Sequence, residues 1–193
     1  MPVAFTPEKQ QFIRQSLRDT ALLLVKEMPV RNIKVEELTR AVGISKGAFY
    51  KFYPSKEALF YDLLRQLHND IFSVPLALLF DIGYDNPADA LCDSMIQCYK
   101  TLDTCDYKRF LIEDSLEIMK IVSETEKQAQ HISEEELFFR FLNRFGSLAV
   151  SRELAFDAIR TLISTIYSQS TLTSNYETIL RWMAQGVCDR LFL

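Results

Sequence analysis

The 193-residue sequence is poor in glycine and proline, with 5 Gly and 6 Pro. The last proline is Pro87, and beyond it the only glycines are Gly146 and Gly186. Sandwiches and barrels need frequent turns built on glycine, proline and asparagine, so this composition argues against a β-rich fold. Hydrophobic residues make up 48% and charged residues 25%, ordinary globular values that exclude a disordered chain.

The sequence also lacks long apolar runs and an export signal. The longest apolar runs cover residues 21–25 and 74–80, whereas a spanning helix needs about 20 apolar residues. Residues 1–4 lack the basic and then apolar pattern of a secretory signal. We therefore expect a cytoplasmic protein without membrane contact, in which the four cysteines are reduced thiols.

Signals for metal binding and catalysis are missing as well. Cys92, Cys98 and Cys105 are too widely spaced for the Cys-x(2–4)-Cys pattern of zinc sites, and His68 and His131 are the only histidines. The sequence has no Gly-x-Ser-x-Gly motif, no phosphate-cradling glycine loop and no metal-binding histidine pair. We predict that the protein is not an enzyme, uses no cofactor or metal, and buries its cysteines as small apolar side chains.

Apolar residues recur with the period of an α-helix along most of the chain, which predicts an all-α fold. Thr6 is a suitable N-cap for the first helix, Pro7 suits its first position, and Pro29 ends it. The fourth helix either continues or kinks near Pro75. The expected helices cover about residues 6–28, 35–42, 46–53, 56 onward, 88–102, 107–122, 134–145, 152–167 and 175–192.

Residues 35–53 have the pattern of a helix-turn-helix, two helices separated by three residues. Gly43 stands where a left-handed residue commonly ends a helix, and Ser45 is a good N-cap for the next one. Phe49 and Tyr53, four residues apart, are expected to face the core. The other residues of this second helix are expected to point away from the core; they include Lys46, Gly47, Ala48, Tyr50 and Lys51.

The net charge of −4 by itself argues against a nucleic-acid-binding protein. The charge is unevenly distributed, because residues 1–70 carry a net charge of +3 and residues 71–193 carry −7. From Arg31 to Lys56 there are six basic residues and two acidic ones. The basic surface therefore coincides with the helix-turn-helix, as neutralisation of a DNA backbone requires.

Residues 35–59, VEELTRAVGISKGAFYKFYPSKEAL, resemble the N-terminal signature of the TetR family of transcriptional regulators. The sequence matches, at nearly every position, a family pattern of the style Ala-Gly-Val-Ser-x-Gly-x-x-Tyr-x-x-Phe-x-Ser-Lys-x-x-Leu. The resemblance implies an N-terminal three-helix DNA-binding domain over residues 1–55. A larger helical domain for ligand binding and dimerisation would then cover residues 56–193, with the fourth helix as the connection.

The resemblance also implies which residues bind DNA. Ser45, Lys46, Gly47 and Ala48 would form the end of the recognition helix that enters the major groove. Tyr50 and Lys56 match positions that contact phosphate, and Lys51 adds basic charge beside them.

Two positions depart from the family pattern. Lys34 stands where the family often has a threonine that caps the second helix, although lysine can itself touch phosphate. Phe52 stands where the family often has a histidine or tyrosine that bonds phosphate, which phenylalanine cannot do.

The function implied is that of a homodimeric repressor that binds a palindromic double-stranded operator. The last two helices, about 152–167 and 175–192, would form the dimer interface. A largely apolar small-molecule effector would bind in the second domain and release the DNA, although the sequence does not locate its pocket. Large apolar residues of that domain, Trp182 among them, are expected mainly in its core. Glu113, Asp114 and Glu117 form either a solvated face or a site for a cationic ligand.

Two other functions remain open at the level of the sequence. The chain could be a helical small-molecule binder or enzyme that merely retains the N-terminal motif, although the six basic residues around the motif argue against this. It could also be a dimerisation or adaptor protein without a ligand.

Overall fold

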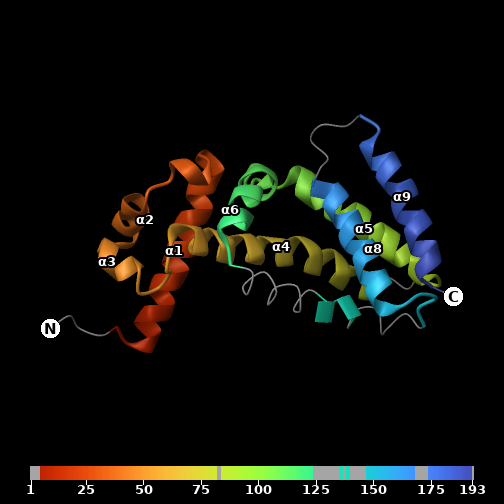
Figure 1. Cartoon of the computed structure of the whole chain (residues 1–193), viewed down its shortest axis with the longest axis horizontal. Coiled ribbons are helices and arrows are strands. Elements are labelled where there is room, and N and C mark those ends of the chain that lie inside the picture. Colours follow the sequence, from red (N-terminus) through yellow and green to blue (C-terminus); the bar gives the residue numbers. More distant parts are fainter. Residues whose placement is uncertain are drawn as a thin grey trace. The chain divides into compact units, whose positions relative to one another are not determined.

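The computed structural model describes residues 5–81, 84–123, 135–136, 138–139, 147–167 and 174–192, with the side chains of residues 72–81 outside the description. These parts are helical, as predicted (Figure 1). Their only β-type pairing is an isolated bridge between Leu148 and Phe192. Most of the helix predicted over 134–145 lies outside the described residues.

The N-terminal helices begin and end close to the predicted positions. Helix α1 covers Pro7–Glu27, with the Thr6 hydroxyl accepting a hydrogen bond from the Lys9 amide at 3.3 Å. A single 3₁₀ turn over Val30–Asn32 leads into α2, Val35–Val42. Helix α3 covers only Lys46–Phe49 and is shorter than predicted, because residues 50–52 form turns. Helix α4, Lys56–Asp81, continues past Pro75.

The chain forms two compact units, and neither is continuous in sequence. Unit 1 contains Met1–His68 together with Asp106–Val122, and unit 2 contains the two remaining segments. Helix α4 therefore contributes residues to both units. Unit 1 also includes a π-helical turn, Phe110–Asp114, which leads directly into α6, Ser115–Ile121.

The core of unit 1 joins these two parts of the sequence. Phe60 of α4 and Phe110 of the π-helical turn are both fully buried, with ring centroids 6.3 Å apart. Phe49 and Tyr53 are buried too, which confirms their predicted core positions. Removing such aromatic side chains from water is the main source of stability for a small unit of this kind.

Asp114 corrects the prediction made for the acidic residues of this segment. Glu113 and Glu117 are exposed, but Asp114 is only 6% exposed. Its Oδ2 accepts a hydrogen bond from the Val30 amide at 3.3 Å and lies 3.6 Å from Arg109 Nη1. Burial raises the pKa of Asp114. Asp114 therefore belongs neither to a solvated face nor to an accessible cation site; it holds the π-helical turn against the 3₁₀ turn that follows α1.

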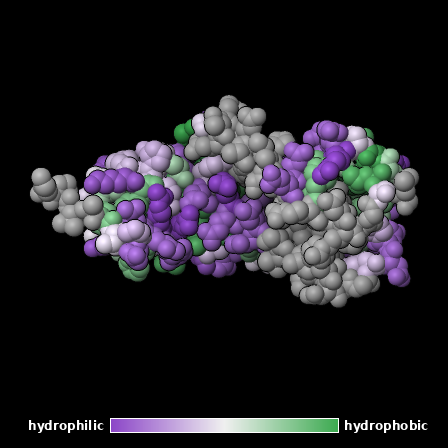
Figure 2. Space-filling model, turned by 90° about the horizontal axis from the view of Figure 1, so that it is seen from below, coloured by the Kyte–Doolittle hydropathy of each residue, from purple (hydrophilic) through white to green (hydrophobic). Residues whose placement is uncertain are grey.

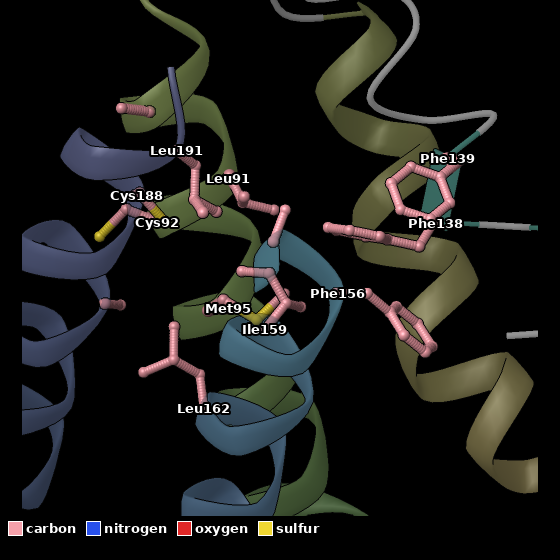
Figure 3. Close-up of a cluster of buried hydrophobic side chains, with 13 residues drawn as sticks. Leu91, Cys92, Met95, Phe138, Phe139, Phe156, Ile159, Leu162, Cys188 and Leu191 are labelled. Atoms are coloured by element: carbon pink, nitrogen blue, oxygen red, sulfur yellow. The ribbon is translucent and has the colours of Figure 1, made fainter. Parts of the chain in front are cut away.

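Unit 2 packs around α5 (Pro87–Thr104), α8 (Arg152–Tyr167) and α9 (Tyr176–Leu191). Leu91, Ile159 and Leu191, one from each helix, converge in its core (Figure 3). Phe156 lies 5.7 Å from Phe138, measured between ring centroids. Cys92, Cys98 and Cys188 are buried free thiols, as expected, whereas Cys105 is partly exposed.

Trp182 is not a core residue, contrary to the expectation for large apolar residues of this part of the chain. It is 71% exposed on α9, and its neighbours Ile179 and Met183 are exposed with it. The helical spacing of these three residues places them on one side of α9. Helix α9 therefore has a second apolar surface besides its buried face, which includes Tyr176, Leu180 and Leu191.

No helix among the described residues is both long enough and apolar enough to cross a bilayer. Over the same residues, no cluster of His, Cys, Asp and Glu side chains is arranged to hold a metal ion.

Candidate nucleic-acid interface

The turn between α2 and α3 depends on the backbone of Gly43. This residue has φ 74° and ψ 33°, the left-handed region in which a side chain is costly. Its amide donates to the Arg40 carbonyl at 3.3 Å, and the Ile44 amide donates to the Thr39 carbonyl at 3.0 Å. These bonds satisfy the last carbonyls of α2 and reverse the chain within three residues.

Helix α3 is anchored on its inner side and open at its N-terminus. The Ser45 hydroxyl accepts a hydrogen bond from the Ala48 amide at 3.1 Å, which confirms the predicted N-cap. Phe49 is fully buried beneath the helix, whereas Ser45, Lys46 and Gly47 are exposed. Hydrophilic side chains cover much of the visible face of this unit (Figure 2). The end of α3 is therefore accessible to a macromolecule.

Gly47 is not required by the fold. A Cβ atom built at this position would meet only the Ser45 hydroxyl, at 4.0 Å, and the backbone angle is not positive. Glycine normally weakens a helix relative to alanine. The lack of a side chain thus leaves open space on the outer surface of α3, into which another molecule can approach the backbone.

The N-terminus of α2 is capped without the threonine that the family pattern would supply. The Glu37 carboxylate accepts a hydrogen bond from the Lys34 amide at 2.8 Å. A carboxylate in the first turn also interacts favourably with the helix dipole. The ammonium group of Lys34 is exposed and is not needed for the cap.

Lys56 is held by the protein itself. Its Nζ donates to the carbonyl oxygens of Val30 at 2.8 Å and Ile33 at 3.0 Å. An ammonium group has three N–H donors, so one remains for an external acceptor. Lys56 thus fixes the 3₁₀ turn before α2 to the first turn of α4, in addition to any contact with phosphate.

The residues after α3 divide into exposed and buried positions. Tyr50 is 47% exposed and Lys51 is exposed, so both are accessible. Phe52 is buried at 7% exposure, with its ring centroid 5.7 Å from that of Phe5. Phe52 therefore contributes to packing where the family pattern would place a polar side chain.

Arg14 is an accessible basic residue that sequence reasoning missed. Its Nη1 donates to the Phe52 carbonyl at 3.1 Å, and its guanidinium carbon lies 5.7 Å from the Phe52 ring centroid and 5.5 Å from that of Tyr53. The residue is exposed. Because the contact spans 38 residues, no local pattern distinguishes Arg14 from other basic residues of α1.

Arg18, one turn further along α1, has a structural role instead. It donates two hydrogen bonds to Asp62 Oδ2, at 2.8 and 2.6 Å, and Asp62 also accepts from the Tyr53 hydroxyl at 3.0 Å. Burial raises the pKa of Tyr53. This network ties α1 to α4 and fixes the segment that leaves α3.

Comparison with known proteins supports this description. Residues 17–63 match the family model described as "Bacterial regulatory proteins, tetR family". The uncharacterized HTH-type transcriptional regulator YuxN of Bacillus subtilis is 27% identical over 179 residues, covering 90% of this chain and 60% of YuxN. The regulator EthR of Mycobacterium tuberculosis is 34% identical over 76 residues, covering 39% of this chain and 33% of EthR. The chain thus matches less than two thirds of the length of these relatives.

Among solved structures, RolR in complex with resorcinol superposes with a TM-score of 0.63 at 16% identity, covering 97% of this chain and 98% of RolR. At that identity the likeness shows the fold alone. The helix-turn-helix, with the N-terminus of α3 exposed, has the arrangement of a DNA-binding domain. Together with the matched model, it identifies residues 17–63 as a DNA-binding domain of the TetR-family type.

Proposed function

We propose that this protein is a cytoplasmic homodimeric repressor that binds a palindromic operator and is released by a small-molecule effector. Ser45, Lys46, Gly47 and Ala48 enter the major groove at the N-terminal end of α3, where a helix can reach base edges. Phosphate contacts on either side come from Lys34, Tyr50, Lys51 and Lys56, and Arg14 adds a further one.

The observation that carries this proposal is the exposed N-terminus of α3. It combines a basic residue, a glycine that the fold does not require and a capped but accessible first turn. Its surroundings offer further donors for phosphate oxygens: Lys34 and Lys51 are exposed, and Arg14 is oriented by the Phe52 carbonyl. Together these features match the requirements of close backbone approach and charge neutralisation.

The apolar surface on the last two helices supports dimerisation. Ile179, Trp182 and Met183 of α9 and Leu154 of α8 are exposed in the single chain. Large apolar side chains in this setting commonly mark a protein–protein contact. A twofold dimer would present two recognition helices to half-sites about 34 Å apart, one turn of DNA.

An effector in unit 2 would act by favouring one of two arrangements of the dimer. The precedent is RolR, which has been solved with resorcinol bound. Helix α4 contributes residues to both units, so a change in its position in unit 2 can be transmitted along the chain. The effector would bind better to the arrangement that cannot span the two half-sites, and would thereby lower the affinity for DNA. DNA binding would in turn lower the affinity for the effector by the same factor.

The decisive experiment is selection of bound fragments from random duplex DNA by the purified full chain. We expect enriched fragments with dyad symmetry and half-sites separated by about one helical turn. Enrichment of sequences without symmetry would contradict the dimeric mode of docking. If no fragment were enriched in a salt-sensitive manner, the proposal that the N-terminus of α3 and its basic neighbours bind DNA would be contradicted.

A further inference from the structure

Lys46, at the exposed end of α3, is part of an ion pair within the helix-turn-helix. Its Nζ lies 2.7 Å from Oε1 of Glu36, the second residue of α2. The hydrogen bond between them lowers the pKa of Glu36 and raises that of Lys46. A carboxylate therefore occupies the surface on which DNA is proposed to dock.

The ion pair is not part of the core. The two side chains are 54% and 53% exposed, and the cap of α2 is supplied by Glu37 instead. Glu36 keeps a favourable interaction with the dipole of α2, but exposed pairs of this kind contribute little to folding. The position of the pair suggests a role in binding, because it neutralises the basic residue nearest the N-terminus of α3.

DNA can use Lys46 only by replacing Glu36. A lysine that contacts a phosphate normally releases a condensed counterion, and this release drives sequence-independent binding. When Lys46 leaves Glu36, the carboxylate is left bare and takes up a cation from solution. The exchange then gives little net counterion release.

We propose that Glu36 competes with DNA for Lys46 and thereby weakens binding to DNA of any sequence. This inference rests on the proposed docking surface. Because a regulator must find its operator among a large excess of other sites, a lower general affinity leaves more of the protein free to occupy the operator.

The test compares Glu36→Gln with the wild-type full chain on a labelled duplex without dyad symmetry, over salt concentrations of about 50 to 200 mM. We expect Glu36→Gln to tighten binding at low salt by up to about fivefold per docked recognition helix. The slope of log K against log salt should steepen by about one for each docked helix. Partial unfolding cannot imitate such a gain. Unchanged or weaker binding by Glu36→Gln would overturn the proposal.

Two control variants separate competition from net charge. Glu27→Gln removes another exposed carboxylate, from α1, and should have a much smaller effect. In a Lys46→Gln background, Glu36→Gln should give a smaller gain than in the wild type, because no lysine is freed. The proposal would be overturned if Glu27→Gln tightened DNA binding as much as Glu36→Gln. It would also be overturned if Glu36→Gln tightened binding equally in the wild type and in the Lys46→Gln background.

The same measurements distinguish this inference from the proposed docking surface. If neither the wild type nor any variant shows salt-sensitive binding, the docking surface is wrong. If the wild type binds with normal salt sensitivity and Glu36→Gln does not differ from it, only the competition is wrong.

Discussion

Two glycines of the helix-turn-helix, four residues apart, are present for different physical reasons. Gly43 has a positive φ that the tight turn requires. Gly47 has neither a positive φ nor a crowded Cβ position. The sequence alone shows two glycines in one motif; the backbone angles show that the fold explains only the first.

This difference predicts opposite effects of alanine at the two sites. Gly47→Ala should leave stability unchanged or raise it by at most about 1 kcal/mol, yet weaken operator binding because its methyl group occupies the docking surface. Gly43→Ala should lower stability by about 1–2 kcal/mol through strain in the left-handed region. Urea denaturation and DNA titration of both variants provide the measurement. Full operator affinity in Gly47→Ala would rule out close approach of DNA at this point.

Lys56 and Lys51 form a second informative pair. Lys56→Ala removes two hydrogen bonds from a charged donor to backbone carbonyls, so we expect a loss of about 1–3 kcal/mol in the free energy of unfolding. It should also shallow the salt dependence of DNA binding by about one per docked helix.

Lys51 is exposed and has no side-chain hydrogen bond within the part of the chain that the structure describes. Lys51→Ala should therefore shallow the salt dependence without a loss of stability. A salt slope equal to that of the wild type in both variants would remove these lysines from the proposed contacts.

At the scale of helices, local signals predicted where the helices begin and end. The residues whose roles were not predicted are those that contact distant parts of the chain. The caps at Thr6 and Ser45 and the stop at Gly43 follow from residue types within one turn, and the sequence identified them. Asp114 escaped prediction because its partner Val30 is 84 residues away. For the same reason, the oriented guanidinium of Arg14 could not be deduced from α1.

Helix α9 illustrates a different limit, because periodicity cannot say which surface covers an apolar face. We expect Trp182→Ala to keep the fold, since the side chain is mostly exposed in the single chain. It should weaken self-association by about 30-fold or more, the loss typical of a tryptophan at the centre of an interface. Sedimentation over a concentration series measures this. Thr178→Ala, an exposed change on the same helix, is the control, and equal dissociation constants for the two variants would contradict a role for this face.

For the molecule as a whole, burial of Asp114 links stability to pH. Because burial raises its pKa, the folded chain binds this proton more tightly than the unfolded chain. The stabilising contribution is complete below the unfolded value of about 3.9 and is lost as the pH rises through the folded value. Asp114→Asn lacks this titration and keeps an oxygen that can accept from Val30.

We therefore expect the stability of the wild type relative to Asp114→Asn to decrease as the pH is raised through this window. Urea denaturation of both proteins at a series of pH values measures the difference. Glu113→Gln, which alters the exposed neighbouring carboxylate, is the matched control. If the wild type differs from Asp114→Asn by the same amount at every pH, burial of this carboxyl has no effect on the proton balance.

Charge is divided between the two parts of the chain on the same large scale. Residues 1–70 are net positive and residues 71–193 net negative, so the overall acidity belongs to the part without the helix-turn-helix. The sequence was sufficient for this conclusion, because counting charges needs no knowledge of contacts. The acidic part should be repelled by the DNA backbone, which favours docking through the basic end alone.

The discontinuity of unit 1 has a consequence for the synthesis of the protein. During translation, residues 1–68 leave the ribosome before Phe110 and Asp114 exist, yet the finished unit packs Phe60 against Phe110 and satisfies the Val30 amide with Asp114. Although N-terminal segments generally fold first, unit 1 can complete its core only after residues 69–105 of unit 2 have also been made. A fragment that ends at residue 68, or a chimera joined there, would carry the helix-turn-helix but lack this part of its core.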